Sequence, residues 1–288
     1  MNRIELYTRV SERAAAVVIR EYSTSFGLAS RLLAEPVRTQ VANIYALVRI
    51  ADEIVDGATD DAGMGSAEAA RALDELEGQT HYALEAGYST NPIVHAFATT
   101  ARATGVGGEL TRPFFESMRS DLEQTVYDTE GFERYVYGSA EVIGLMCLQS
   151  FLAGHSRTVA QREQLVAGAR ALGAAFQKVN FLRDLGDDYQ RLGRSYFPDV
   201  DVATFTDAAK FYILEDIAED LSASRVALPL LPPSSRRAVA LAHSLFAELA
   251  DRLYATPAHL MLSARVSVPT PTKLRLAAAA YAGRLPRA

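Results

Sequence analysis

Apolar residues recur along this chain at intervals of three and four positions, which is the period of an amphipathic α-helix. One such stripe consists of Val37, Val41, Ile44, Val48 and Val55. No stretch alternates convincingly between apolar and polar residues at period two, the pattern of a half-buried β-strand. The chain is therefore predicted to be helical almost throughout.

Breaks in this pattern divide the chain into separate helices. One helix is expected to start at Pro36, which suits a first turn, and to end near Gly57. Residues 57–66 are rich in glycine and aspartate and are expected to form a mobile flap. A strongly apolar helix, buried on most sides, is expected over about residues 130–153. With no internal repeat, residues 1–288 are predicted to form a single all-α domain.

One predicted helix carries an unusual stripe of polar side chains. The stripe consists of Gln177, Asn180, Asp184 and Asp188. Steps of three and four place these side chains on one face, and oxygen ligands in a row are what a hard cation such as Mg²⁺ binds. A solvated acidic face would look the same, so this helix alone leaves both interpretations open.

The same arrangement occurs upstream, beside the apolar stripe that begins at Val37. Its members are Tyr45, Arg49, Asp52 and Asp56. Two helices thus each carry an Asp-x-x-x-Asp pair next to core residues. If the two pairs face each other, they can hold several divalent ions between them.

Composition narrows the class of protein. The 288 residues are 49% hydrophobic and carry a net charge of −6, which suits a globular chain and gives no reason to expect nucleic-acid binding.

The single cysteine, Cys147, excludes an intrachain disulfide and is expected to be a buried apolar residue in a reducing compartment. We find no signal peptide and no apolar run that could span a bilayer. A cytoplasmic protein is expected, one that reaches a lipid substrate peripherally, at the inner face of the membrane.

Facing carboxylate pairs suit one kind of substrate. Mg²⁺ usually binds one or two carboxylates together with phosphate oxygens, so two such sites suggest a diphosphate leaving group. An allylic diphosphate would leave a carbocation, which needs apolar and aromatic walls that exclude water. The aromatic residues on or near the stripes are Phe26, Tyr45, Phe176 and Phe181. Core packing explains any single one of them equally well.

Basic and hydroxyl side chains near the stripes are candidates for binding diphosphate oxygens. Arg49 shares its stripe with two aspartates, while Arg183 and Arg194 lie beside the second pair. Each arginine can instead form an ion pair within its helix, which is weak when exposed. Ser23 and Ser25 can donate hydrogen bonds to phosphate or simply cap the following helix.

Taken in order, these motifs resemble those of the squalene/phytoene synthases. The family's second sequence pattern is matched by Leu172-Gly173, Gln177, Asn180-Phe181, Arg183-Asp184-Leu185, Asp188 and residues 194–198. Residues 135–144 resemble its first pattern, residues 45–56 its first aspartate-rich motif, and residues 23–26 its N-terminal serine motif. The resemblance covers about residues 15–270.

The resemblance implies an isoprenoid synthase fold, a single helical bundle around a central apolar cavity. It also implies that two prenyl diphosphates are joined head to head through a cyclopropylcarbinyl diphosphate. Carried over by position, the residues that bind Mg²⁺ (or Mn²⁺) would be Asp52, Asp56, Asn180, Asp184 and Asp188. Arg49 and Tyr45 would take part in catalysis with the four aspartates. The substrate-binding residues would be Ser23, Ser25, Phe26, Arg49, Gln177, Asn180, Arg183 and Arg194.

Two positions depart from the family's pattern. Glu141 stands where the family usually has a small residue, which places a polar group in or near the cavity wall. Phe246 stands where a tyrosine usually lies near the second ionisation site, and Tyr254 follows two turns later. Phenylalanine cannot donate a hydrogen bond to a departing diphosphate, so the second half-reaction is the less strongly indicated one.

Within the family, the chain looks most like the compact bacterial phytoene synthases. These join two C20 geranylgeranyl diphosphates into phytoene, through prephytoene diphosphate and without NADPH, so neighbouring enzymes of carotenoid biosynthesis are expected partners. Ser30 is small and would leave room for a long chain if it borders the cavity. The alternative is a C30 enzyme that converts farnesyl diphosphate to dehydrosqualene, presqualene diphosphate or squalene.

Two interpretations belong to other classes of protein. A non-catalytic scaffold with the same fold would gain nothing from two intact aspartate pairs. A di-iron bundle would need Glu-x-x-His pairs, and none occurs in this sequence. The five histidines lie outside the motifs and are expected to be structural or exposed.

Overall fold

The computed structural model describes residues 2–286, apart from the side chains of Ser25, Asp60, Gln190, Arg191 and Leu192. Within this range the chain is helical, with no β-strand beyond one isolated bridge. Its α-helices are α1 (Arg3–Tyr22), α2 (Ser25–Ser30), α3 (Val37–Asp56), α4 (Ala58–Asp61), α5 (Ser66–Ala86), α6 (Pro92–Thr104), α7 (Gly108–Glu123), α8 (Thr129–Val136), α9 (Val142–Leu152), α10 (Val159–Leu192), α11 (Asp207–Ala227), α12 (Pro233–Ala255), α13 (Ala258–Met261) and α14 (Thr270–Tyr281). A π-helical turn, η1 (Tyr137–Glu141), joins α8 to α9, and the 3-10 turns η2 (Val202–Thr204) and η3 (Leu228–Leu230) flank α11. The prediction of an all-α fold is confirmed.

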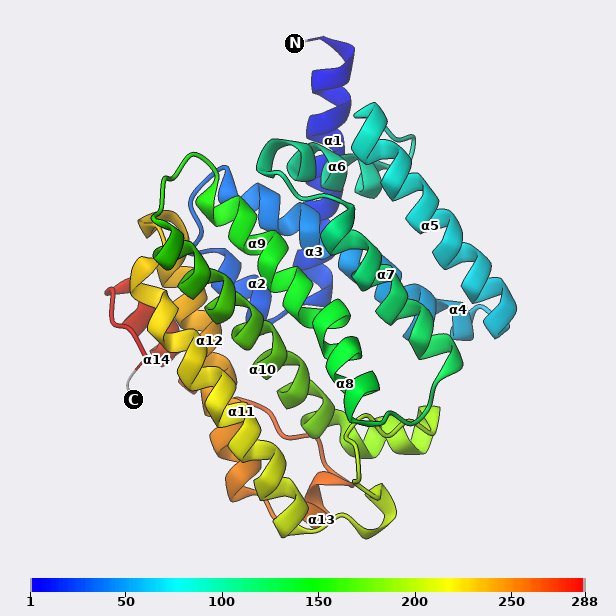
Figure 1. Cartoon of the computed structure of the whole chain (residues 1–288), viewed down its shortest axis with the longest axis vertical. Coiled ribbons are helices and arrows are strands. Elements are labelled where there is room, and N and C mark those ends of the chain that lie inside the picture. The colour runs from blue at the N-terminus through cyan, green and yellow to red at the C-terminus, as the bar shows by residue number, and fades with distance from the viewer. Residues whose placement is uncertain (1, 287–288) are drawn as a thin grey trace.

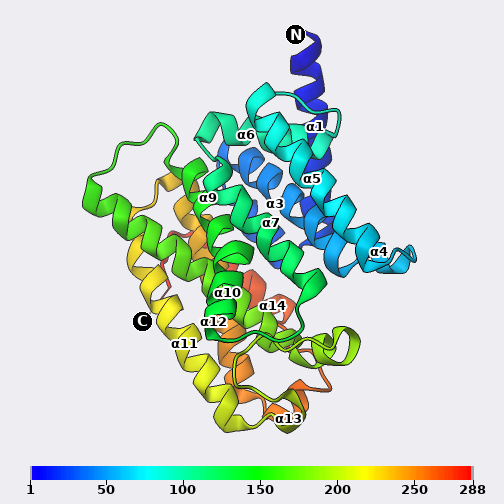
Figure 2. The same cartoon turned by 45° about the vertical axis from the view of Figure 1, so that its right-hand side comes forward.

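The helices form two groups that meet along α9 and η1. In one group, α10 lies alongside α11, and α12 packs against both (Figures 1 and 2). In the other group, α3 is surrounded by α1, α5, α6, α7 and α9. The first turns of α1 extend beyond the rest of the molecule (Figure 2). The two helices that carry the polar stripes, α3 and α10, therefore belong to different groups.

The apolar stripe of α3 packs as its period predicts. Val41, Ile44 and Val55 are buried, and the last two belong to a large apolar cluster with residues of α5, α6, α7 and α9. The group around α10 has its own large cluster, in which Leu182 and Leu185 pack against α11 and α12. Each polar stripe thus runs along a helix whose other faces are fixed in a packed core.

Two glycines allow α9 and η1 to approach α10 closely. A Cβ atom on Gly144 would lie 2.5 Å from the carbonyl oxygen of Ala169, and one on Gly173 would lie 2.6 Å from the carbonyl oxygen of Ala140. Any larger residue would therefore force the helices apart. The helix predicted over residues 130–153 is in fact divided among α8, η1 and α9, because a π-turn interrupts it.

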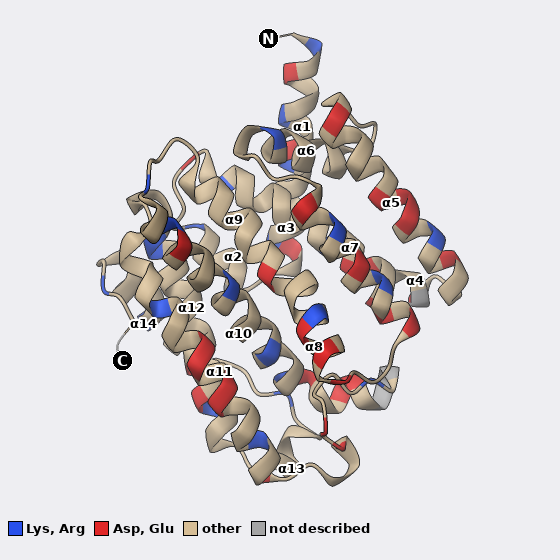
Figure 3. Cartoon of the chain, in the orientation of Figure 1, with Lys and Arg blue, Asp and Glu red and all other residues tan. Residues whose placement is uncertain are grey.

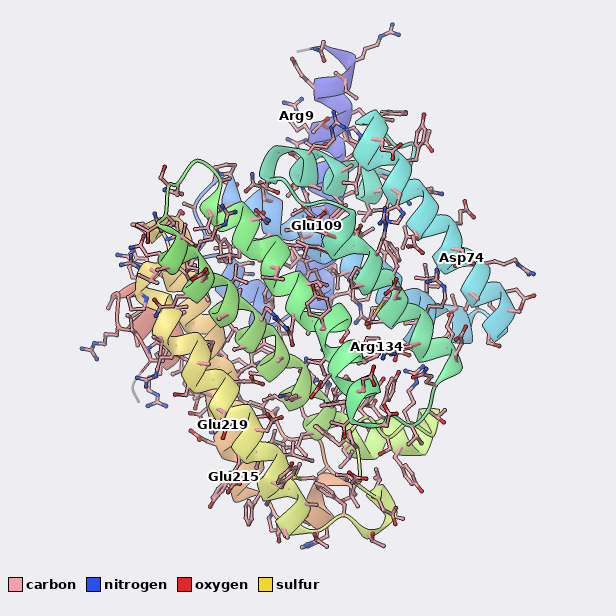
Figure 4. All side chains as sticks on the ribbon, viewed as in Figure 1. Arg9, Asp74, Glu109, Arg134, Glu215 and Glu219 are labelled. Atoms are coloured by element: carbon pink, nitrogen blue, oxygen red, sulfur yellow. The ribbon has the colours of Figure 1, made fainter. Side chains whose placement is uncertain are left out.

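Two features of the surface complete the fold. Residues 57–66 were predicted to be a loop that forms a mobile flap. They include the helical turn α4, so the prediction of a loop is wrong in part, and its mobility stays a prediction. Charged side chains cover outward faces, as Asp74 on α5, Arg134 on α8 and Glu215 on α11 illustrate (Figure 4). No helix within residues 2–286 combines the length and the apolar character needed to cross a bilayer.

Candidate active site

A cavity of about 750 Å³ lies between α2, α3, α9, α10 and α12. Most of its wall is apolar. The larger apolar side chains in the wall are Phe26, Leu33, Val48, Ile143, Leu148, Phe151, Leu172, Phe176, Val239, Leu245, Phe246 and Leu249. A hollow of this kind can enclose a hydrocarbon chain and exclude water from it.

Polar side chains line the rest of the cavity. Those predicted from the sequence are Ser23, Tyr45, Arg49, Gln177, Asn180 and Arg183, and the predicted Phe26 lies in the wall with them. Arg265 and Lys273 also line the cavity, although the sequence motifs did not identify them. The predicted Ser25 cannot be placed, because its side chain lies outside the described residues. The structure thus brings most of the predicted binding residues to one cavity, while their roles stay predictions.

The acidic stripe of α3 is neutralised by arginine. Asp52 accepts a hydrogen bond from Arg49, with 2.6 Å between Nη1 and Oδ2, and Arg49 also pairs with Glu53. The Arg49 guanidinium lies 4.6 Å from the centre of the Tyr22 ring, in a cation–π contact. Asp52 itself is not part of the cavity wall, whereas Arg49 is. A guanidinium held by two carboxylates therefore stands at the polar end of the cavity.

The acidic stripe of α10 has a similar arrangement. Asp184 accepts hydrogen bonds from Arg183 and Arg265, with Nε–Oδ1 distances of 2.9 and 2.8 Å. Burial acts to raise the pKa of Asp184, but the two guanidinium groups outweigh it and hold that pKa below its usual value. Both arginines line the cavity. Asp184 thus positions two cationic groups at the same polar end.

The two acidic stripes face each other. Burial raises the pKa of Asp188 to about 7, and the negative charges of Asp184 on its own helix and Asp56 on α3 add to the shift. Burial likewise raises the pKa of Asp52 to about 6, against the attraction of Arg49 and with repulsion from Asp56. Repulsion that acts between α3 and α10 requires their carboxylates to be close. No three His, Cys, Asp or Glu side chains within the described residues are grouped so as to hold one metal ion.

Arg194, which was predicted to bind substrate, is not among the residues that line the cavity, and its role stays a prediction. Its side chain is only 6% exposed, and Nη1 of Arg194 donates a hydrogen bond to Oδ1 of Asp56 over 2.5 Å. Nη2 donates to the backbone carbonyl of Asp121 at 2.6 Å, and the Asp121 carboxylate lies 3.8 Å from Nη1. Tyr135 and Tyr196 donate hydrogen bonds to Asp121, at 2.7 and 3.3 Å. Arg194 therefore fixes Asp56 at the end of α3 to the buried Asp121 of α7.

Asp121 was not predicted from the sequence. Burial raises its pKa to about 8, and the charge of Asp56 adds to the shift, although Arg194 opposes it. Its carboxylate is 1% exposed, so its environment is set by the groups that contact it. No spacing in the sequence relates Asp121 to Asp56 or Arg194, because the three residues lie on separate elements.

The positions that depart from the family's pattern are also placed by the structure. Phe246 lines the cavity and stacks on Phe176, with ring centres 3.7 Å apart, while Tyr254 is 61% exposed and contacts Phe211 instead. Glu141 forms an ion pair with Arg170, and it is not part of the cavity wall. The stacked rings of Phe176 and Phe246 therefore occupy the place where the family usually has a tyrosine. The carboxylate of Glu141 does not reach the cavity wall.

Two small residues of the wall complete the cavity. Ser30 lines the cavity, which is the condition for it to leave room for a long hydrocarbon chain. Its hydroxyl donates a hydrogen bond to the carbonyl of Gly27 at 2.9 Å. Cys147 also lines the cavity and packs against apolar residues, but it is only partly buried, whereas the sequence predicted a buried residue. Its apolar surroundings raise the pKa of the thiol to about 12, which leaves it un-ionised.

Replacing Arg194 by alanine is expected to destabilise the protein by about 3–5 kcal/mol, because Asp56 would lose its ion-pair partner and the buried carbonyl of Asp121 would lose its hydrogen-bond donor. Arg252→Ala is the control, since it removes one partner of a partly exposed pair with Glu248 within α12 and is expected to cost less than about 1 kcal/mol. Urea unfolding of both variants measures the difference. Equal losses would show that the buried contacts of Arg194 do not stabilise the fold.

Comparison with known proteins agrees with this geometry. The chain is 34% identical over 195 residues to "Phytoene synthase 3, chloroplastic" of Zea mays, a match that covers 66% of this chain and 44% of that protein. It is 29% identical over 253 residues to "Phytoene synthase" of Pseudescherichia vulneris, covering 81% and 79% of the two chains. It is also 29% identical over 181 residues to "4,4'-diapophytoene synthase" of Staphylococcus haemolyticus, covering 62% and 59%. The match thus spans about half the length of the plant relative.

The fold has close counterparts among solved structures. A dehydrosqualene synthase crystallised with a ligand superimposes with a TM-score of 0.77 at 22% sequence identity, covering 98% of this chain and 99% of that one. A sequence model described as "Squalene/phytoene synthase" matches residues 19–272. This match covers both polar stripes, the cavity wall and the Arg194 contacts, and it shows that the chain belongs to the squalene/phytoene synthase family.

Proposed function

We propose that this chain is a phytoene synthase, which joins two geranylgeranyl diphosphates head to head through prephytoene diphosphate. The single observation that carries the proposal is the cavity, whose wall is mostly apolar but includes three arginines and a lysine, two of the arginines on the helices that carry the acidic stripes. An apolar chain and a diphosphate on the same molecule would occupy the two parts of this wall. The phytoene synthases among its relatives support the same assignment.

The two stripes offer side chains of the kind that Mg²⁺ binds, although no three of their carboxylates are grouped as a metal site within the described residues. Asp52, Asp56, Asn180, Asp184 and Asp188 offer only oxygen ligands from their side chains, which Mg²⁺ and Mn²⁺ prefer. Burial is the main cause of the raised pKa values of Asp52 and Asp188, and repulsion from neighbouring carboxylates adds to it; a divalent cation would relieve that repulsion. Bound there with the substrate, the metal would neutralise charge on the diphosphate and so favour its departure.

The arginines would bind and orient the diphosphate. Arg49, Arg183 and Arg265 line the cavity while each is held by a carboxylate of a stripe. Their planar guanidinium groups suit pairs of phosphate oxygens. Lys273 adds a fourth cationic group to the wall. A diphosphate placed among them would lie at the polar end, with its hydrocarbon chain directed along the apolar wall.

The apolar wall would protect the carbocation that is left when diphosphate departs. Phe26 stacks on Tyr45 with ring centres 5.6 Å apart, and Phe176 stacks on Phe246, so aromatic faces occur on several sides. Ring faces attract positive charge, and a dry wall prevents capture by water. One substrate would ionise and release its diphosphate, the double bond of the other would attack the allylic cation, and loss of a proton would close the cyclopropane ring. This intermediate would then release the second diphosphate, rearrange and lose a second proton. No reductant is consumed in this sequence.

A C30 enzyme is the second candidate, favoured by the similarity to the 4,4'-diapophytoene synthase. The choice depends on how long a chain the cavity admits. Ser30 offers little obstruction in the wall, which favours the C20 substrate. A non-catalytic scaffold has less support, because such a protein has no use for arginines held in a cavity by intact aspartate pairs. Contacts with other carotenoid enzymes stay a prediction.

The proposal is tested by the product. Purified protein with Mg²⁺, without reductant, is expected to convert geranylgeranyl diphosphate to a C40 hydrocarbon, measured by mass spectrometry after extraction. Asp52→Asn and Asp184→Asn are expected to lower turnover about 100-fold or more, because each replaces a charged metal ligand by a neutral, weaker one. Asp216→Asn, at a half-exposed acid of α11 that pairs with Lys178, is the matched control and should keep full activity. Unchanged turnover in the first two variants would refute the metal site.

Chain length is tested at Ser30. Ser30→Phe would fill part of the cavity and is expected to reduce the yield of C40 product roughly tenfold or more, while C30 product from farnesyl diphosphate is retained. Ser222→Phe, at an exposed position of α11, is the control for the added ring. The ratio of the two products from each variant is the measurement. An unaltered ratio would mean that Ser30 does not limit the substrate.

A further inference from the structure

The end of the chain differs in charge from the rest. After Asp251 the sequence contains no Asp or Glu, although the whole chain has a net charge of −6. The basic residues of this segment are Arg252, Arg265, Lys273, Arg275, Arg284 and Arg287. Its last helix, α14, lies beside α12, and neither α14 nor the segment that leads to it carries a red, acidic position (Figure 3). The surface around α14 is therefore a local source of positive potential on an acidic protein.

α14 has two apolar faces. Leu276, Ala277 and Ala280 pack against α2 and α12, which accounts for one face. Leu274 and Tyr281 lie one turn to either side of the exposed Ala278 on the other face, and they are 59% and 68% exposed. The exposed Leu274, Ala278 and Tyr281 thus extend the apolar surface of α14 beyond the part that packs on α2 and α12, onto an adjoining side that is open to solvent. The outer face of α14 is therefore suited to contact an apolar phase.

The arginine side chains around the outer face of α14 are exposed and can contact a partner. The Arg275 side chain is 72% exposed and makes only a long contact of 3.8 Å with Glu248. Arg284 is exposed just beyond the helix, and Arg237 of α12 lies 5.9 Å from the centre of the Tyr281 ring. An apolar stripe bordered by arginine, with a tyrosine at its edge, is the composition of helices that lie in the interface of an anionic bilayer.

We propose that the outer face of α14, formed by Leu274, Ala278, Tyr281, Arg275 and Arg284, docks on an anionic lipid bilayer. A protein partner fits less well, because a stable interface needs about 800 Å² from each side and this face is one helix about 18 Å long. A bilayer needs only shallow apolar insertion and positive charge, and it binds reversibly on those terms.

The α1 helix is the competing surface. Leu6, Val10 and Val17 are about half exposed along it, and Arg9 projects from it (Figure 4). Acidic residues alternate with its arginines, however, beginning with Glu5 in the first turn. Charge complementarity to an anionic surface therefore favours α14.

Docking at α14 would place the cavity close to the membrane. Lys273 in the first turn of α14, and Val266 and Val268 just before it, form part of the cavity wall. If the proposed function holds, apolar substrates and product would pass between the cavity and the lipid near this segment. The docking itself does not require the enzyme to turn over.

Vesicle binding tests the inference without substrate. The full chain is expected to sediment with vesicles of phosphatidylcholine and phosphatidylglycerol, and not with phosphatidylcholine alone, and added salt should release it. Arg275→Gln with Arg284→Gln should weaken binding roughly fivefold for each charge removed. Leu274→Ser with Tyr281→Ser should weaken it about tenfold or more, since apolar contact is lost. All four substitutions are at exposed positions, and thermal melting checks that each variant is folded.

Control variants separate this surface from others. Tyr212→Ser removes a tyrosine that is 77% exposed on α11, and it should leave vesicle binding unchanged. Loss of binding in Leu6→Ser with Val10→Ser, but not in the α14 variants, would assign the contact to α1 and overturn the proposal. Absence of vesicle binding, together with a dimer in sedimentation velocity that Leu274→Ser abolishes, would assign the face to a second copy instead. A protein that binds vesicles but makes no hydrocarbon would refute the proposed function and leave the docking surface intact.

Discussion

The buried guanidinium of Arg194 is the contact on which the polar end of the cavity depends. It pairs with Asp56 at the end of α3 and binds the backbone of Asp121 in α7, and the tyrosines at positions 135 and 196 complete the hydrogen bonds of Asp121. A buried cation compensates for two carboxylates that would otherwise repel each other. Asp56 can therefore approach the aspartates of α10, and the two helices, which belong to different groups in the fold, present their acidic stripes to each other.

Charged and apolar side chains occupy different parts of the cavity wall. The carboxylates of the stripes do not line the wall; they hold arginines that do, such as Arg49 and Arg183. The rest of the wall comes from apolar residues of α2, α3, α9, α10 and α12, and Gly144 and Gly173 allow α9 and η1 to pack closely on α10. A substrate with a charged head and a long hydrocarbon chain matches this division. The site is thus a consequence of helix packing and local ion pairs together.

Periodicity was sufficient to predict the elements of this site. The stripes on α3 and α10 follow from steps of three and four, and α3 ends one residue before the predicted Gly57. The contacts of Arg265 and Asp121 could not be predicted, because they join residues far apart in the chain: Arg265 lies 81 positions from Asp184. The contacts of the Arg194 side chain could not be predicted either, because a sequence motif does not say which neighbour a long side chain contacts. The π-turn before α9 has no period of its own and was missed for that reason.

The central claim is that α3 and α10 together hold a divalent metal with a diphosphate. The most direct measurement is a crystal structure of the protein grown with Mn²⁺ and inorganic diphosphate, with anomalous scattering used to locate the metal. The account predicts Mn²⁺ between the two stripes, with carboxylate ligands from both helices and diphosphate oxygens beside Arg49 and Arg183. Diphosphate bound by the arginines with no metal between the stripes, or metal held by one helix alone, would contradict it.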